Sequence, residues 1–179
     1  MKNLILIGFM GAGKTTVGRL LAKEKGMHFA DTDDRIVSEQ GKSIPDIFSS
    51  YGEPYFRDLE TDVLKRMQED TRNTVISVGG GMPVREENRA LLRSLGCVIY
   101  LTATKRTILC RVRNDGSRPM LNGEDLAEKV EQLMNARERF YKQAAHIYIR
   151  TDGRTIHQVV QIIDQETRRF MTEPRQPEG

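Results

Sequence analysis

The segment from Gly8 to Thr15 constrains the fold of this chain more than any other part of its sequence. It reads Gly-Phe-Met-Gly-Ala-Gly-Lys-Thr and matches the pattern G-x-x-x-x-G-K-[ST] at every fixed position. The apolar run Leu4 to Ile7 precedes it, and a helical pattern from Thr15 to Lys25 follows it. Strand, glycine-rich loop and helix form the context in which this pattern binds nucleotide phosphates. The structural alternative is a glycine-rich turn with an incidental lysine, and the full match argues against it.

The fixed residues of this pattern each have a physical reason. Glycine at positions 11 and 13 lets the backbone curl until its N–H groups point at a phosphate, where a Cβ atom would crowd the anion. The helix N-terminus adds the positive end of its dipole. Lys14 offers a compact charge to the β- and γ-phosphates, and the Thr15 hydroxyl can bind Mg²⁺. We therefore expect the phosphates of ATP to contact Gly11, Ala12, Gly13, Lys14, Thr15 and Thr16.

Strand-like and helix-like patterns alternate along the whole chain. Strands are expected at 4–7, 27–30, 74–78, 97–102 and 147–149. Helices are expected at 15–25, at 34–69 with breaks at Gly41 and Gly52, and at 84–95, 104–112, 126–144 and 156–170. Such alternation predicts an α/β fold in three layers, with a parallel sheet between helices. Ligands of these sheets bind beyond the carboxyl ends of the strands.

The length and charge of the chain exclude several classes of protein. Its 179 residues suffice for one domain and are too few for two ordinary ones. The net charge is only +3 and basic residues are mixed with acidic ones, so we expect no nucleic-acid partner. No apolar run approaches the roughly 20 residues needed to span a bilayer, so we expect no membrane association. Cys97 and Cys110 form no CxxC pair, which suits the reducing cytoplasm.

The segment 113–124 indicates which kind of nucleotide-binding protein this is. It loses helical periodicity and contains Gly116, Arg118, Pro119 and Gly123. An arginine-bearing mobile loop suits a lid that closes over ATP and excludes water, the competing phosphoryl acceptor. A guanine-specific switch carries an Asn-Lys-x-Asp loop, and no asparagine of this chain is followed by lysine. We therefore predict a small-molecule kinase, with an ATP-binding regulator as the alternative from another class.

An acidic pair, Asp31 and Asp33, follows the second expected strand at the predicted ligand edge of the sheet. One carboxylate there can hold Mg²⁺ through water, and another can accept the proton of an acceptor hydroxyl. The structural alternative is that Asp34 and its neighbours only cap the next helix.

Arg57 lies on an expected helix with Glu60 three residues later, on the same face. An arginine held in this way can bind a substrate carboxylate in bidentate fashion, and an exposed ion pair is the alternative. Arg137 lies in the long helix 126–144, where a solvated helix face is the alternative.

The glycine segment, Gly79-Gly80-Gly81, ends the third expected strand. Three consecutive glycines cost chain entropy, which indicates close approach of the backbone to a ligand, with a simple tight turn as the alternative.

Together these motifs resemble the shikimate kinase family. They occur in its order and spacing: the phosphate-binding loop, Asp31-Thr32-Asp33, Gly52-Glu53-x-x-Phe56-Arg57-x-x-Glu60, the glycine segment, Arg118-Pro119 and Arg137. The resemblance covers about residues 2–170. It implies the fold of nucleoside monophosphate kinases, with a five-stranded parallel sheet, a lid near 112–124 and a substrate-binding region near 33–61.

The resemblance also implies an activity, the ATP-dependent phosphorylation of the 3-hydroxyl of shikimate, with Mg²⁺. Arg57 and Arg137 would meet the carboxylate of shikimate, and Asp33 and the glycine segment its hydroxyls. Arg118 would act on ATP and the moving phosphate, and Lys14 on the phosphates. Thr15 would bind Mg²⁺ directly and Asp31 through water, and Arg154 would lie beside the adenine.

Gluconate kinase, or another kinase of small metabolites, is the nearest rival within the enzymes, because a sugar acid also has a carboxylate and hydroxyls. We expect one domain over residues 1–171, a tail at 172–179, and a monomer. The expected chemistry is direct transfer from ATP to the acceptor oxygen, without a covalent enzyme intermediate.

Overall fold

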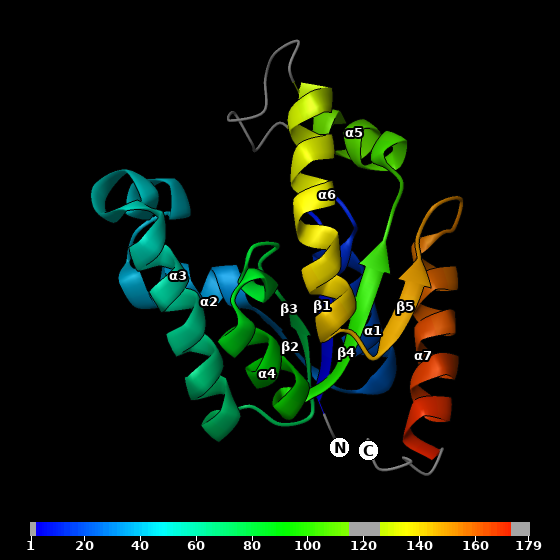
Figure 1. The fold of residues 1–179 in the computed structure, drawn as a ribbon. Coiled ribbons are helices and arrows are strands. Elements are labelled where there is room, and N and C mark those ends of the chain that lie inside the picture. Colours follow the sequence, from blue (N-terminus) through cyan, green and yellow to red (C-terminus); the bar gives the residue numbers. More distant parts are fainter. Residues whose placement is uncertain (1–2, 115–125, 173–179) are drawn as a thin grey trace, which may run out of the picture.

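The computed structural model describes residues 3–114 and 126–172. Five parallel strands form one sheet in the order β2-β3-β1-β4-β5 (Figure 1). The strands are β1 (Asn3–Ile7), β2 (His28–Asp31), β3 (Thr74–Ser77), β4 (Gly96–Thr102) and β5 (Ile147–Arg150). The helices are α1 (Lys14–Lys25), α2 (Thr32–Gln40), α3 (Ile44–Asp70), the 3-10 helix η1 (Met82–Val84), α4 (Glu86–Leu95), α5 (Lys105–Asn114), α6 (Leu126–Ala144) and α7 (Ile156–Thr172).

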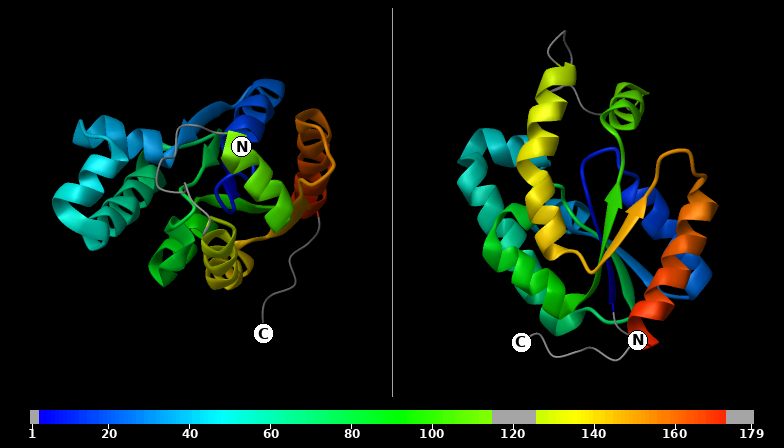
Figure 2. Two further views of the ribbon diagram at one scale, coloured as in Figure 1. Left: turned by 90° about the horizontal axis from the view of Figure 1, so that it is seen from above. Right: turned by 45° about the vertical axis from the view of Figure 1, so that its right-hand side comes forward.

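The central strand β1 is buried along its whole length, as its unbroken apolar sequence predicts. Its backbone pairs with β3 on one side and β4 on the other, so Leu4 lies opposite both Val75 and Cys97. Helices cover both faces of the sheet. Seen from above in Figure 2, α1 and α7 lie on one face, and α4 and α6 on the other. The predicted three-layer α/β fold with five parallel strands is confirmed.

The ligand edge of the sheet is formed by the carboxyl ends of the strands. The helices α3 and α6 both extend beyond this edge, on two sides of it (Figure 1). The α3 helix is broken at Gly52, whose φ of 80° and ψ of 172° are not helical. The predicted break at Gly52 is therefore confirmed, and it lies within the proposed substrate-binding region.

Several element ends differ from the sequence-based expectations. The α5 helix continues to Asn114 and α7 to Thr172, two residues beyond the expected ends in each case. The first residues of the expected lid and of the expected tail are therefore helical. The rest of the expected lid, including Arg118, lies outside the described residues, as does the tail from 173 onward. None of the helices in the described ranges is long and apolar enough to cross a membrane.

Candidate active site

The phosphate-binding loop joins β1 to α1 at the ligand edge. Gly11 has a φ of 74° and Gly13 a φ of 96°, in the left-handed region that only glycine adopts readily. These values explain why the loop requires glycine there. The ammonium of Lys14 donates hydrogen bonds to the carbonyl oxygens of Gly8 at 2.9 Å and Phe9 at 3.1 Å. The lysine charge therefore lies over the loop, close to where N–H groups at the start of α1 favour an anion.

Asp31 links the phosphate-binding loop to α2. One carboxylate oxygen accepts a hydrogen bond from the Thr15 hydroxyl at 3.0 Å, and the other accepts one from the backbone N–H of Asp33 at 3.0 Å. Asp31 is thus the N-cap residue of α2. The capping alternative is therefore confirmed for Asp31 and not for Asp34, because α2 begins at Thr32.

The hydroxyls and the carboxylate around Thr15 fit a magnesium ion. Besides Asp31, the hydroxyl of Ser77 lies 3.3 Å from the Thr15 hydroxyl. All these groups are hard oxygen donors, and Mg²⁺ usually keeps several waters and takes one or two carboxylates together with phosphate oxygens. Within the described residues no group of three or more His, Cys, Asp or Glu side chains could hold a metal by itself. The hydroxyls and the carboxylate around Thr15 fit a metal that also binds phosphate oxygens.

A cavity of about 210 Å³ opens beside this loop at the ligand edge. Residues from all the sequence motifs within the described ranges line it, although they come from distant parts of the chain. Its polar lining includes Lys14, Thr15, Asp31, Asp33, Arg57, Glu60, Ser77, Gly79, Gly80, Gly81 and Arg137. An apolar wall is formed by Met10, Ile44, Phe48 and Phe56. The cavity thus combines cations, carboxylates and an apolar side, as a small anionic molecule with hydroxyls would require.

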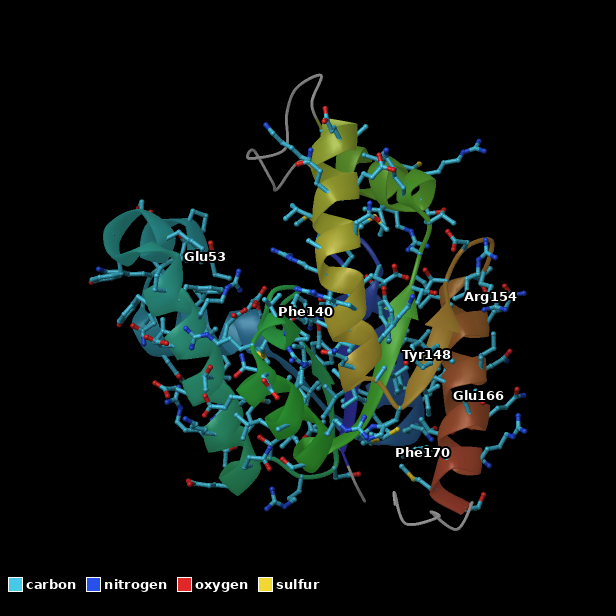
Figure 3. All side chains as sticks on the ribbon, in the orientation of Figure 1. Glu53, Phe140, Tyr148, Arg154, Glu166 and Phe170 are labelled. Atoms are coloured by element: carbon cyan, nitrogen blue, oxygen red, sulfur yellow. The ribbon has the colours of Figure 1, made fainter. Side chains whose placement is uncertain are left out.

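The guanidinium of Arg57 lies between two carboxylates on its own helix. Its Nη1 donates to Glu60 at 2.7 Å, as expected from their spacing. Its Nε and Nη2 donate to one oxygen of Glu53, at 3.2 and 2.7 Å. The Glu60 side chain is 1% exposed and that of Glu53 is 63% exposed. Arg57 is therefore held by the buried Glu60 on one side and by the exposed Glu53 on the other. Figure 3 shows Glu53 on α3.

Burial controls the protonation of Glu60. It raises the pKa of Glu60 to about 7, because the attraction of Arg57 only partly offsets the cost of burying a carboxylate. The negative charge of Asp33 raises it further. For Arg57, burial lowers the pKa, but Glu60 and Glu53 more than offset this, so its pKa is raised. Arg57 is accordingly a permanent cation at the cavity.

The glycine segment accommodates side chains from the other elements of the site. A Cβ atom on Gly79 would lie 2.6 Å from a carboxylate oxygen of Asp33. A Cβ atom on Gly81 would lie 2.2 Å from Nη1 of Arg57. We expected these glycines to admit a ligand. In the structure, the absence of a Cβ atom at Gly79 and Gly81 leaves room for the side chains of Asp33 and Arg57. Any larger residue at these positions would displace those side chains.

A second hollow, of about 180 Å³, lies on the other side of the phosphate-binding loop. Its lining includes Ala12, Gly13, Thr16, Val17, Arg111, Thr151, Arg154, Ile156 and Val159. Arg154 therefore lies beside the loop, as expected for a residue near the adenine, and far from Glu53 across the molecule (Figure 3).

Arg111 on α5 also belongs to this second hollow. Its Nη1 donates to the carbonyl oxygens of Gly11 at 3.0 Å and Ala12 at 3.3 Å, and to the Thr151 hydroxyl at 3.3 Å. Arg111 lies on α5, just before the expected lid. Its hydrogen bonds hold the backbone of the phosphate-binding loop.

Four further contacts of the site were not predicted, and they involve Glu53, Ser77, Thr32 and Tyr141. The Thr32 hydroxyl accepts from the backbone N–H of Gly79 at 2.9 Å, and the Tyr141 hydroxyl donates to the carbonyl of Gly80 at 2.6 Å. For Glu53 the spacing to Arg57 is a signal in the sequence, since residues four apart share a helix face. Ser77 and Thr32 carry no such signal, because their partners are distant in the chain.

Comparison with known proteins agrees with this geometry. The family model described as shikimate kinase matches residues 10–168. The shikimate kinase of Geobacter metallireducens is 42% identical over 160 residues, which are 89% of this chain and 88% of the relative. That of Symbiobacterium thermophilum is 44% identical over 160 residues, 88% of this chain and 91% of the relative. A structure of shikimate kinase from Acinetobacter baumannii in complex with shikimate has a TM-score of 0.89 and 36% identity, and covers 97% of this chain and 96% of the other. The chain belongs to the shikimate kinase family.

Proposed function

We propose that this chain transfers the γ-phosphate of ATP to the 3-hydroxyl of shikimate and so forms shikimate 3-phosphate and ADP. The observation that carries this proposal is the single cavity shared by the phosphate-binding loop, through Lys14 and Thr15, and by an acceptor-binding set, Asp33, Arg57 and Arg137. A phosphoryl donor and a carboxylate-bearing acceptor can therefore meet there. Membership in the shikimate kinase family supports shikimate, rather than a sugar acid, as that acceptor.

The phosphates of ATP bind the N–H groups of Gly11, Ala12 and Gly13, the ammonium of Lys14, and the start of α1 at Thr15 and Thr16. The second hollow receives the adenine beside Arg154. Arg111, through its bonds to the loop carbonyls, holds the loop in shape for this binding.

We propose Mg²⁺ as the divalent metal. The Thr15 hydroxyl would bind it directly, and Asp31 through water, which suits their mutual hydrogen bond of 3.0 Å. The ion would neutralise charge on the phosphate oxygens and so make the γ-phosphorus easier to attack.

The carboxylate of shikimate binds between Arg57 and Arg137, and its hydroxyls bind Asp33 and the backbone of the glycine segment. A planar guanidinium matches a carboxylate with two parallel hydrogen bonds, which fixes orientation as well as affinity. The hydrogen bonds from Arg57 to Glu53 and Glu60 limit the rotamers of Arg57 before the substrate arrives. Less conformational entropy is then lost on binding.

Transfer is direct. The 3-oxygen of shikimate attacks the γ-phosphorus, the bond from that phosphorus to the β,γ-bridging oxygen breaks, and ADP leaves. Asp33 orients the attacking hydroxyl and accepts its proton as the new bond forms. Arg118 is assigned from its motif to neutralise charge on ATP and the moving phosphoryl group. Most of the rate enhancement comes from positioning and charge neutralisation.

The enzyme is proposed to act as a monomer in the cytoplasm. Among the described residues the exposed large apolar side chains are spread over several elements rather than gathered into one broad patch: Val37, Tyr51, Tyr55, Tyr148, Ile156 and Met171. Cys110 is an exposed free thiol, which suits a reducing compartment.

A coupled assay of ADP release tests the proposed activity. It compares shikimate with gluconate and other sugar acids at saturating MgATP. We expect shikimate-dependent release and turnover of the sugar acids lower by orders of magnitude. Equal turnover of a sugar acid would reassign the acceptor, and ATP binding without turnover of any acceptor would favour a regulator.

A further inference from the structure

The hydroxyl of Tyr141 connects two parts of the site that are distant in sequence. Tyr141 lies on α6 and is 1% exposed, and its ring packs on Tyr100 with ring centroids 5.1 Å apart. Its hydroxyl donates a hydrogen bond of 2.6 Å to the carbonyl oxygen of Gly80. A buried phenol oxygen needs such a partner, but a tyrosine placed only to fill the core could be replaced by phenylalanine at little cost.

Arg137 lies on the same helix, one turn before Tyr141. Burial raises the pKa of Tyr141 to about 12, and the positive charge of Arg137 only partly opposes this. At neutral pH the phenol therefore keeps its proton. It can therefore donate that proton to Gly80, while the phenol oxygen stays within the field of the Arg137 charge.

Arg137 and Gly80 both line the cavity in which the acceptor is proposed to bind. They are carried by different elements, α6 and the segment after β3, whose relative position is set by the side chains between them. Without the hydroxyl, the ring would still fill the core, but the Gly80 carbonyl would lose its donor, and α6, which carries Arg137, would lose its hydrogen bond to the glycine segment.

We propose that Tyr141 is a positioning residue, which joins Arg137 to the glycine segment so that both hold the carboxylate-bearing acceptor as one unit. This inference rests on the proposed function. Tyr141 touches neither ATP nor the reacting atoms. Its effect is on acceptor binding, through the direction of the Arg137 guanidinium and of the Gly80 backbone.

The test is Tyr141→Phe, which keeps the buried ring and removes only the hydroxyl. The matched control is Tyr148→Phe, because the Tyr148 hydroxyl also donates to a backbone carbonyl, that of Lys142 at 2.9 Å, but on the exposed side of β5 away from the cavity lining (Figure 3). Steady-state ADP release gives KM for shikimate and for ATP, calorimetry gives the Kd of shikimate, and thermal unfolding reports the fold.

We expect Tyr141→Phe to raise KM and Kd for shikimate about tenfold, the effect of one buried hydrogen bond, with KM for ATP and kcat nearly unchanged. Tyr148→Phe should change neither KM. A lower Tm with an unchanged KM for shikimate would overturn the inference, since the hydroxyl would then serve the fold alone. An equal rise in both KM values would also overturn it. A wild-type protein that binds shikimate without turning it over would contradict the proposed function, while the Kd comparison would still decide on Tyr141.

Discussion

Substituting Gly81 by alanine should displace Arg57 and thereby weaken acceptor binding. The new Cβ atom would lie 2.2 Å from Nη1 and 2.7 Å from both Cζ and Nη2 of Arg57. Non-bonded heavy atoms settle at roughly 3.5 Å, so the guanidinium must move by about 1 Å. Gly81 has no positive φ, so the backbone itself accepts alanine. The end of a long side chain can move at little cost to the fold, and Gly81→Ala should remain folded.

A misplacement of about 1 Å in a positioning group can cost on the order of 100-fold, or about 2.7 kcal/mol of transition-state stabilisation. We therefore expect kcat/KM for shikimate to fall about 100-fold in Gly81→Ala, while KM for ATP stays within about twofold of its wild-type value. The coupled ADP-release assay measures both when each substrate is varied at saturation of the other.

Gly80→Ala is the matched control for this substitution. A Cβ atom on Gly80 would find its nearest neighbours at 3.5 to 3.8 Å, which is ordinary contact. We expect a smaller loss in kcat/KM for shikimate than in Gly81→Ala. The reasoning would be refuted if Gly81→Ala kept the wild-type kcat/KM for shikimate, or if Gly80→Ala were equally damaging.

Three further predictions concern the charged groups of the site. Burial raises the pKa of Glu60 from 4.5 to about 7, so its contribution to stability is fully present below pH 4.5 and is lost as pH rises through 7. The free energy of unfolding, measured by urea titration, should therefore fall across this range by roughly 3 kcal/mol more in the wild type than in Glu60→Gln. Parallel pH profiles of the two proteins would contradict this. Glu60→Ala should raise KM for shikimate more than Glu53→Ala. The Glu60 side chain is 1% exposed and that of Glu53 is 63% exposed, and an ion pair contributes more when it is buried. The reverse order of KM values in steady-state kinetics would show that the surface contact with Glu53 dominates. Lys14→Ala and Asp33→Ala should each lower kcat by at least about 100-fold with an unchanged circular dichroism spectrum, and near-normal kcat in Asp33→Ala would remove its proposed role.

The fold could be predicted from local sequence patterns because its core is simple. The apolar run of β1, the glycines at 11 and 13, and the alternation of strands and helices all point to one parallel sheet. The ends of α5 and α7 were less certain. Gly116 and Pro174 each follow the observed helix end by two residues, but such signals locate a helix end only to within a few residues, because helix ends depend on small differences in free energy.

The site was predicted in part from residue chemistry and in part from resemblance. The phosphate-binding loop follows from chemistry alone, whereas the pairing of Arg57 with Arg137 needed the family pattern. Gly79 and Gly81 leave space for the side chains of Asp33 and Arg57. This role could not be predicted, because it depends on how α2 and α3 pack against the end of β3. The Tyr141 contact with Gly80 joins residues 61 apart, and only the folded chain brings them together.

The most direct test of the central claim is the fate of shikimate and of its 3-deoxy analogue with the purified enzyme and MgATP. Phosphorus NMR identifies the product, and the coupled assay counts ADP. With shikimate we predict one ADP for each phosphate ester, formed on the 3-oxygen alone. The analogue should compete with shikimate and yield no ester. A phosphate ester on another oxygen, or turnover of the analogue at a rate like that of shikimate, would contradict the account.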